Sequence, residues 1–184
     1  MQPDDPIEKL KVLLNRVEDV DAGAAVAALI SRGEEGLKVL LVKRSENPSD
    51  PWSGQMAFPG GRRRLEDHDL KETVVRETFE ETGIDLDRYL FLGTLDVAFS
   101  KVAIGLGVLP FVVLADERPE IVLNEELCSH LWIPIDLLNL SKGNARVKHR
   151  EVPAYTVKGH VVWGLTYRIV ENLLGLMCAQ EKRS

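Results

Sequence analysis

The stretch that decides the fold is Arg76-Glu77-Thr78-Phe79-Glu80-Glu81-Thr82-Gly83-Ile84. It closes a segment, residues 69–82, that has the pattern and propensity of a helix, and Gly83 stands where a glycine ends many helices. Just before it lies Gly54-Gln55-Met56-Ala57-Phe58-Pro59-Gly60-Gly61-Arg62, whose adjacent glycines allow a tight turn that directs backbone polar groups toward a ligand. The sequence therefore predicts an acidic helix preceded by a glycine-rich loop.

The acidic face of this helix is the first functional signal. At 100° per residue, Glu77, Glu80 and Glu81 fall within a sector of about 100°. Like charges at these spacings oppose helix formation by roughly 0.2–0.5 kcal/mol per pair, and the helix dipole disfavours them near the C-terminus. The pattern indicates either a bound cation or a solvated acidic face partly balanced by Lys71 and Arg76. Carboxylate oxygens suit Mg²⁺ or Mn²⁺, and the stretch has no His or Cys for zinc.

Apolar patterns on both sides of this segment predict a layered domain. Val74, Val75 and Phe79 lie beside the acidic sector and are expected to anchor the helix to a core. Strands on both sides of a central helix, with helices at the ends, are typical of an α/β or α+β domain. Helices are predicted at about 5–18, 135–140 and about 164–179. Strands are predicted at 22–30, 37–42, 91–99, 105–114 and 131–135, with one or two more in the last 35 residues.

Composition narrows the classes of function. The 184 residues suit one domain, and 23 Lys and Arg against 29 Asp and Glu give a formal charge of -6. This balance argues against a general binder of nucleic acids or anionic membranes. Cys128 and Cys178 are too few for a disulfide framework and are interpreted as small buried residues of a reducing compartment. No apolar run spans a bilayer and the acidic N-terminus lacks the basic flank of a signal peptide, so a cytoplasmic protein is expected.

The two motifs together resemble the signature of the Nudix hydrolases. That signature runs Gly, five residues, Glu, seven residues, then Arg-Glu-apolar-x-Glu-Glu-x-Gly-apolar. Gly61 opens it here, and residues 76–84 close it with every charged position in place. Asp67 stands at the first Glu position, eight residues rather than seven follow it, and Thr78 replaces an apolar residue. The helical half is intact, and whether Asp67 fills the role of the first Glu is left open.

The resemblance implies both a fold and an activity. The fold is an α/β/α sandwich with a mixed β-sheet, formed by a single domain over residues 1–184 with the signature at 61–84. The activity is hydrolysis of a diphosphate linked to another moiety, using Mg²⁺ or Mn²⁺ and an activated water. The expected partner is a small nucleoside diphosphate derivative rather than a nucleic acid or a membrane, and a homodimer is left open.

By motif position, the resemblance also implies a set of metal ligands. Glu77 and Glu81 would ligate the metal, with Glu80 sharing a second ion. A backbone carbonyl of Gly60 or Gly61 would add a ligand, and Gly61 is taken as the candidate.

Three residues are predicted to carry catalysis: Glu81, Arg76 and Glu126. Arg76 would orient a catalytic carboxylate through charge-assisted hydrogen bonds, and the alternative is an ordinary surface ion pair. Family members often place a catalytic Glu on a loop such as the one that precedes residues 131–135 here. Glu126 is therefore the first choice as general base, and a solvent-facing loop is the alternative.

Substrate contacts are predicted at Arg44, Trp52, Arg62 and Lys101. The cations would meet phosphates, or form a solvated loop. Trp52 would stack on a base, or pack within its own loop.

Three stretches resemble the coenzyme A pyrophosphatase branch: Leu41-Val42-Lys43-Arg44-Ser45, the glycine-rich loop and Val162-Trp163-Gly164-Leu165-Thr166. Residues 46–53, however, are one residue longer than in that branch and lack its Leu-Arg pair and its His. Coenzyme A or an acyl form is therefore the first expected substrate. A second hypothesis is ADP-ribose, a dinucleotide or a nucleoside triphosphate, and a third is a non-catalytic nucleotide-binding or regulatory module.

Overall fold

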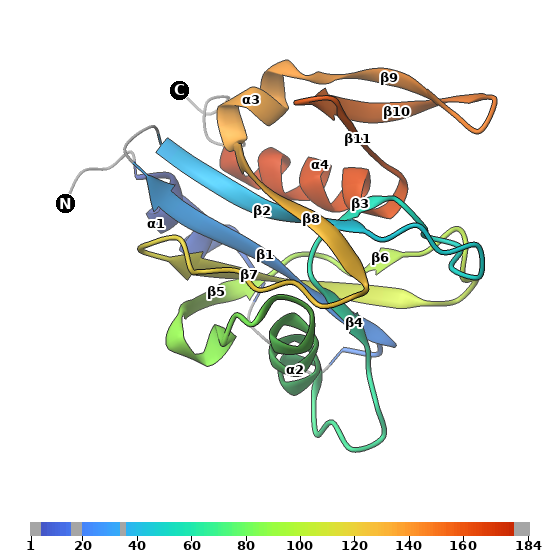
Figure 1. Cartoon of the computed structure of the whole chain (residues 1–184). Helices are drawn as coiled ribbons and strands as arrows, with labels where there is room; N and C mark the ends of the chain where they lie inside the picture. Colours follow the sequence, from blue (N-terminus) through green and yellow to red (C-terminus); the bar gives the residue numbers. More distant parts are fainter. Residues whose placement is uncertain (1–4, 16–19, 34–35, 179–184) are drawn as a thin grey trace.

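The computed structural model describes residues 5–15, 20–33 and 36–178, which form a mixed sheet between helices and a smaller second sheet (Figure 1). The main sheet follows the order β3-β2-β1-β7-β5, with β4 on β1, β6 on β7 and β8 on β2. The pair β1 and β7 is parallel, and the other pairs are antiparallel. Its strands are β1 (Ala24–Gly33), β2 (Gly36–Arg44), β3 (Met56–Ala57), β4 (Gly60–Arg62), β5 (Leu90–Thr94), β6 (Ala98–Phe99), β7 (Gly107–Ala115) and β8 (Leu127–Pro134).

The second sheet has the order β11-β10-β9 and packs beside the C-terminal helix (Figure 1). Its strands are β9 (Lys142–Val147), β10 (Arg150–Val157) and β11 (His160–Trp163). The helices are α1 (Pro6–Leu13), α2 (Leu70–Thr82), the 3₁₀ turn η1 (Leu86–Arg88), α3 (Ile135–Leu140) and α4 (Gly164–Cys178). None of these described helices is both long and apolar enough to cross a lipid bilayer.

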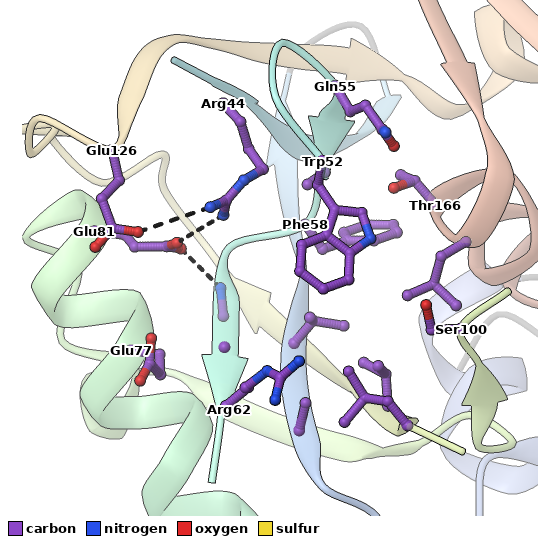
Figure 2. A pocket seen from close by; sticks show the side chains of 18 of the residues that line it. Arg44, Trp52, Gln55, Phe58, Arg62, Glu77, Glu81, Ser100, Glu126 and Thr166 are labelled. Carbon is purple, nitrogen blue, oxygen red and sulfur yellow. Dashed lines mark hydrogen bonds and ion pairs between the residues drawn. The ribbon is translucent and has the colours of Figure 1, made fainter. Parts of the chain in front are cut away.

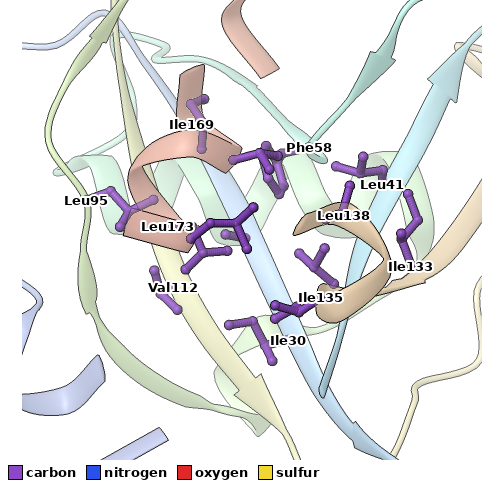
Figure 3. Packing of buried hydrophobic residues seen from close by; sticks show 14 of the residues in the cluster. Ile30, Leu41, Phe58, Leu95, Val112, Ile133, Ile135, Leu138, Ile169 and Leu173 are labelled. Carbon is purple, nitrogen blue, oxygen red and sulfur yellow. The ribbon is translucent and has the colours of Figure 1, made fainter. Parts of the chain in front are cut away.

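The strand β1 divides the core into two layers because its side chains alternate between faces. Ala27 and Leu29 face the layer that α2 covers, where Leu70 and Val74 meet them. Ala28 and Ile30 face the opposite layer, which α1, α3 and α4 cover and which Figure 3 shows from close by. A strand that is buried on both faces needs small and branched apolar residues at successive positions, as residues 24–30 of β1 have.

The helix α2 forms as the sequence predicts. The carboxylate of Asp69 caps its first turn by accepting a hydrogen bond from the Glu72 backbone N–H at 2.7 Å. Gly83 ends it in the left-handed region, with φ 71°. The prediction for Phe79 is wrong, because that ring is 57% exposed. The buried stripe runs through Leu70, Val74, Thr78 and Glu81, and its centre lies about 145° away from Phe79 around the helix.

Other elements differ from the sequence prediction. The N-terminal helix ends at Leu13 rather than near residue 18, because Leu14 is extended and Asn15 pairs through its backbone with Thr94; residues 16–18 lie outside the described residues. The strand predicted at 91–99 is two strands, β5 and β6, and β9 was not predicted. Both cysteines are exposed rather than buried. At the C-terminus α4 is described to Cys178, and Ala179 lies outside the described residues.

Candidate active site

A cleft of about 420 Å³ opens where β4 and α2 meet the loop before β3 and the start of α4 (Figure 2). One wall carries the acidic residues Glu77 and Glu81, and Glu126 joins them from the loop before β8. Arginine side chains stand beside these carboxylates, whereas the opposite wall is mostly apolar. Residues far apart in the sequence thus combine negative, positive and apolar surfaces in one hollow.

Glu81 is the most buried ionisable group of the cleft, with 4% of its surface exposed. Its Oε2 accepts a hydrogen bond from the Gly60 backbone N–H at 2.9 Å, and its Oε1 lies 3.9 Å from Nη1 of Arg44. Burial raises the pKa of Glu81 to about 7, although the Gly60 hydrogen bond and the Arg44 charge oppose the shift. The negative charges of Glu77 and Glu126 raise it further. A buried carboxylate of this kind favours a bound cation or a proton near neutral pH.

Glu77 stands against the glycine strand β4. A Cβ atom on Gly61 would lie 2.2 Å from Oε2 of Glu77, so only a glycine leaves the carboxylate its present place. Arg76 holds the same carboxylate from the other side, because its Nη1 donates a hydrogen bond to Oε1 of Glu77. The Arg76 side chain does not line the cleft itself, but it donates hydrogen bonds to Glu77 and to the Arg62 carbonyl, and both of these residues line the cleft. The predicted orienting contact of Arg76 is therefore present, and it is made to Glu77.

Arg76 is held in turn by Asp67, the residue at the altered signature position. Asp67 accepts hydrogen bonds from Nε of Arg76 at 2.9 Å and from Nη2 at 2.8 Å. The Arg76 guanidinium lowers the pKa of Asp67 well below its ordinary value of 3.8, although burial opposes this shift. The backbone N–H of Arg64 and the hydroxyl of Thr73 also bond to Asp67 and lower its pKa. Asp67 thus anchors the arginine, despite the additional residue between them.

Glu80 differs from Glu77 and Glu81, the other two glutamates of the acidic face. Its side chain is 41% exposed and accepts two hydrogen bonds from Arg64, at 3.1 and 2.9 Å. It does not line the cleft, whereas Arg64 does. Arg64 also approaches Glu77, with 3.9 Å between Nη2 and Oε1. Glu80 would have to exchange this arginine for a metal ion before it acted as the predicted ligand.

The carboxylates of the cleft are the kind of ligand that a divalent cation prefers, but two of them are too few to surround one. In residues 5–15, 20–33 and 36–178, no group of three or more His, Cys, Asp or Glu side chains is placed to hold a metal ion. Glu77 and Glu81 are two hard oxygen donors at one cleft wall. Mg²⁺ in proteins is commonly held by one or two carboxylates, with substrate phosphates and waters completing its octahedron. The two carboxylates therefore fit a site that the substrate completes.

The register of β4 decides which glycine carbonyl faces this wall. The Pro59 carbonyl accepts a hydrogen bond from the Ala27 N–H of β1, and the Arg63 N–H donates one to the Gly23 carbonyl beside β1. Because alternate residues of a strand face the same neighbour, the Gly61 carbonyl points toward β1 as well. Gly60 faces away from β1, as its hydrogen bond to Glu81 shows. The geometry therefore favours the carbonyl of Gly60 as the backbone ligand of a metal ion, rather than that of Gly61, which was predicted.

Arg44 and Glu126 meet at the mouth of the cleft (Figure 2). The Arg44 Nε donates a hydrogen bond to Asp50 at 2.8 Å, while Nη2 lies 3.9 Å from Glu126 Oε2. The Glu126 side chain is 63% exposed, so water reaches it directly. This predicted general base and this predicted substrate contact do share one site.

The apolar wall comes from three distant segments. Trp52 and Phe58 lie over the cleft, and Thr166 faces them from the first turn of α4 (Figure 2). The Thr166 hydroxyl donates a hydrogen bond to the Met56 carbonyl at 2.9 Å, which ties α4 to β3 across 110 positions of sequence. This contact explains why the stretch around Thr166 belongs with the glycine-rich loop.

The two remaining predicted substrate contacts, Arg62 and Lys101, differ in position. Arg62 lines the cleft, as predicted, from the end of β4. Lys101 does not line it: it is exposed on a turn in which the Ser100 hydroxyl accepts hydrogen bonds from the Val102 and Ala103 N–H groups. That turn brings Ser100 to the cleft instead. The contacts of Asp50 with Arg44 and of Thr166 with Met56 were not predicted, since neither residue carries a local sequence signal of its contact.

Comparison with known proteins gives a consistent family. The family model described as the NUDIX domain matches residues 21–155. A peroxisomal coenzyme A diphosphatase of Caenorhabditis elegans is 39% identical over 118 residues, which are 62% of this chain and 49% of that protein. A protein of Schizosaccharomyces pombe without characterised function is 38% identical over 60% of this chain and 36% of its own length. The chain therefore spans between a third and a half of these two relatives.

A bacterial relative matches more fully. The Nudix hydrolase NudL of Yersinia enterocolitica, itself uncharacterised, is 32% identical over 158 residues, which are 82% of this chain and 78% of that one. Among solved structures, a Nudix hydrolase from M. smegmatis superposes with a TM-score of 0.54 at 24% identity, over 64% of this chain and 73% of its own. An Ap4A hydrolase of C. elegans does so with a TM-score of 0.53 at 18% identity, over 61% of this chain and 80% of its own. At these identities the two structures support the fold alone.

Proposed function

The chain belongs to the Nudix hydrolase family, and from that premise we propose that it hydrolyses the diphosphate of a nucleoside diphosphate derivative with the help of Mg²⁺ or Mn²⁺. The mixed sheet between helices agrees with the fold that the resemblance implied. The observation that carries the proposal is the cleft itself. Paired carboxylates, arginines and an apolar wall line one hollow of about 420 Å³.

In this proposal each charged group has a separate role. Glu77, Glu81 and the Gly60 carbonyl would hold the cation, and Glu80 would add a ligand only if Arg64 released it. A bound divalent ion neutralises charge on the diphosphate and lowers the pKa of a coordinated water. Arg62 and Arg44 face the cleft, where guanidinium groups bind phosphate oxygens in charge-assisted pairs.

Glu126 is the proposed general base. It lines the cleft from outside α2, its carboxylate is exposed, and Arg44 lies at 3.9 Å from it. At that distance Arg44 forms no hydrogen bond with Glu126, so the carboxylate can accept a proton from water. Arg76 supports the reaction indirectly, because it fixes Glu77 from behind.

Coenzyme A or its acyl forms are the first proposed substrates. Support comes from the C. elegans relative that is named a coenzyme A diphosphatase and from the apolar wall, which suits a substrate with an apolar arm. The altered segment 46–53 supplies Trp52 to this wall, so it is the place where substrate choice would change. ADP-ribose, a dinucleotide or a nucleoside triphosphate is the alternative within the same chemistry.

A product screen tests the proposal. The protein is incubated with Mg²⁺ or Mn²⁺ and coenzyme A, acetyl-coenzyme A, ADP-ribose, Ap4A or ATP, and products are separated chromatographically. Release of 3′,5′-ADP and phosphopantetheine from coenzyme A is the expected result. Preference for another diphosphate would keep the reaction and change the substrate. Hydrolysis of none of them, together with intact nucleotide binding, would replace the proposal by a non-catalytic binding module.

The cellular setting follows the same expectation. Two exposed cysteines without a disulfide agree with a reducing compartment such as the cytoplasm, whereas the C. elegans relative is named peroxisomal. Tagged full-length protein in cell fractions distinguishes the two compartments.

A further inference from the structure

Asp50 stands behind the cleft and touches two of the residues that line it. Its Oδ2 accepts a hydrogen bond from Nε of Arg44 at 2.8 Å, and its Oδ1 accepts one from the Trp52 backbone N–H at 2.9 Å. Only 14% of the Asp50 side chain is exposed. Arg44 and Trp52 line the cleft, and Asp50 does not. One carboxylate thus bonds both to the guanidinium of Arg44 and to the backbone of Trp52.

The contact to Nε fixes how Arg44 presents its other nitrogens. With Nε bound to Asp50, Nη1 faces Glu81 and Nη2 faces Glu126, each at 3.9 Å (Figure 2). These separations exceed hydrogen-bond length, so the two terminal nitrogens keep donors for a further acceptor. A guanidinium held in this way presents a fork that matches phosphate oxygens.

The contact to the backbone fixes Trp52. Asp50 is at the start of a turn in which the Ser53 N–H bonds to the Asp50 carbonyl at 3.0 Å and the Gln55 N–H bonds to the Trp52 carbonyl at 3.1 Å. A side chain that accepts from the N–H two residues later closes an Asx turn and restricts the backbone between them. The turn thereby sets the position of the Trp52 backbone, from which the indole extends over the cleft opposite Thr166 (Figure 2).

We propose that Asp50 is a positioning residue for nucleotide recognition. It couples two contacts with the ligand: the Arg44 guanidinium binds a phosphate, and the Trp52 ring stacks on the base. The inference rests on the proposed function for the class of ligand and assigns this coupling to the segment, residues 46–53, in which the sequence departs from the coenzyme A pyrophosphatase branch. Removing the negative charge of Asp50 frees Arg44, while removing the Oδ1 acceptor frees Trp52. The two arms can therefore be separated by substitution.

Calorimetric titration with two ligands that cannot be hydrolysed tests this coupling in the full chain with Mg²⁺. The ligands are α,β-methylene-ADP, which has a base, and methylenediphosphonate, which has none. Asp50→Asn keeps an acceptor for Trp52 but no charge for Arg44, so both ligands are expected to bind about fivefold more weakly. Asp50→Ala also releases the ring. The affinity for the nucleotide is therefore expected to fall about tenfold further than in Asp50→Asn, whereas the affinity for methylenediphosphonate is expected to equal that of Asp50→Asn.

Controls decide between positioning and general damage. Ser49→Ala, at an exposed position one residue earlier, is expected to bind both ligands like the original protein. In a Trp52→Ala background, Asp50→Ala is expected to leave the ratio of the two affinities unchanged. The proposal would be overturned if Asp50→Ala weakened the two ligands equally, or if neither variant weakened either ligand. Equal affinity of the original protein for the two ligands would overturn it as well.

The result is independent of turnover. A chain that hydrolyses no diphosphate but shows the predicted affinity ratios refutes the proposed reaction and retains the role of Asp50. Thermal unfolding monitors each variant. Should Asp50→Ala not fold, Asp50→Asn still decides, because any change in its affinity ratio contradicts the assignment.

Discussion

Both carboxylate oxygens of Asp67 accept hydrogen bonds from Arg76: Oδ1 from Nε at 2.9 Å and Oδ2 from Nη2 at 2.8 Å. The pair is largely shielded, since 4% of the Asp67 side chain and 20% of the Arg76 side chain are exposed. Through Arg76 it also reaches Glu77, because the Arg76 Nη1 bonds to that carboxylate. The residue that looked like a defect of the signature is therefore the rear anchor of one predicted metal ligand.

Loss of this anchor is expected to cost both stability and activity. Removing Asp67 leaves Nε and Nη2 of the largely buried Arg76 without their carboxylate acceptor, so Asp67→Ala is expected to lower the free energy of unfolding by about 3 kcal/mol. Turnover is expected to fall as well, because Arg76 no longer holds Glu77 in place. Urea unfolding and steady-state kinetics measure the two effects. Glu66→Gln, at the exposed preceding position, is the control, and an equal effect there would contradict the prediction.

The same pair predicts a pH dependence. The pKa of Asp67 is lower in the folded protein than its ordinary value of 3.8. Its contribution to stability is therefore complete above about pH 4 and is lost as the pH falls below that value. Between the original protein and Asp67→Asn, the difference in unfolding free energy is expected to shrink by about 1.4 kcal/mol per pH unit below pH 3.8. A difference that stays constant from pH 6 to pH 2.5 would exclude this origin.

The helix and its two cleft carboxylates were predictable because their signals are local. A cap, a helical period and a terminal glycine all lie within residues 69–83. The exposure of Phe79 was not predictable from the sector it shares with Val75, because the sheet below α2 contacts a stripe centred on Val74 and Thr78. The direction in which a helix faces its sheet depends on tertiary packing.

Contacts made by loops and exposed strands were missed for a different reason. Asp50 reaches Arg44 across six residues that have no period, and Lys101 turns outward because of backbone bonds to Ser100. The strand β9 has mostly exposed side chains, so it lacks the apolar alternation that predicts a strand. Only the fold places such residues in or out of the cleft.

The glycines of β4 are expected to fail in different ways when given a side chain. In Gly61→Ala the new Cβ meets the end of the Glu77 side chain at 2.2 Å, which can move away. In Gly60→Ala it meets the Ala25 carbonyl oxygen at 2.3 Å and the Val26 Cα at 2.6 Å, which cannot. Gly60 also has φ 138°, a conformation that favours glycine.

We therefore expect Gly61→Ala to fold with nearly unchanged stability and to lose about 100-fold or more in turnover, as a displaced ligand would. Gly60→Ala is expected to be destabilised by more than about 3 kcal/mol. Circular dichroism with urea titration, run beside the diphosphatase assay, separates the two. Comparable stability of both variants would contradict the stated geometry.

Glu77 and Glu80 allow a second matched comparison, because both are glutamates of the same helix. Glu77 lines the cleft, while Glu80 is 41% exposed and paired with Arg64. Glu77→Gln is expected to weaken Mn²⁺ binding and reduce turnover by about 100-fold or more, with the fold intact. Glu80→Gln is expected to have the smaller effect on both, as measured by electron paramagnetic resonance titration of Mn²⁺ and by kinetics. The reverse order would place the metal on the Glu80 side of the helix.

Glu81 carries a conflict between stability and function that can be measured without a substrate. Its pKa of about 7 in the folded protein exceeds the ordinary value of 4.5, because burial disfavours the charged form. Relative to the protonated state, the folded protein therefore loses stability as the pH rises from 4.5 through 7, by about 3 kcal/mol in total. Glu81→Gln has no such charge, so it is expected to be more stable than the original protein at pH 8 in EDTA.

This gain is expected to vanish near pH 4.5, where both side chains are neutral. Added Mn²⁺ is expected to stabilise the original protein and to have little effect on Glu81→Gln, because a cation compensates a charge that only the glutamate has. Glu80→Gln, whose parent carboxylate is far more exposed, provides the matched control on the same helix. Unfolding curves at pH 4.5, 6 and 8, with EDTA or Mn²⁺, measure all three proteins. A Glu81→Gln variant less stable than the original at pH 8 in EDTA would show that burial does not burden this carboxylate, and the case for a cation at its side would then rest on Glu77 alone.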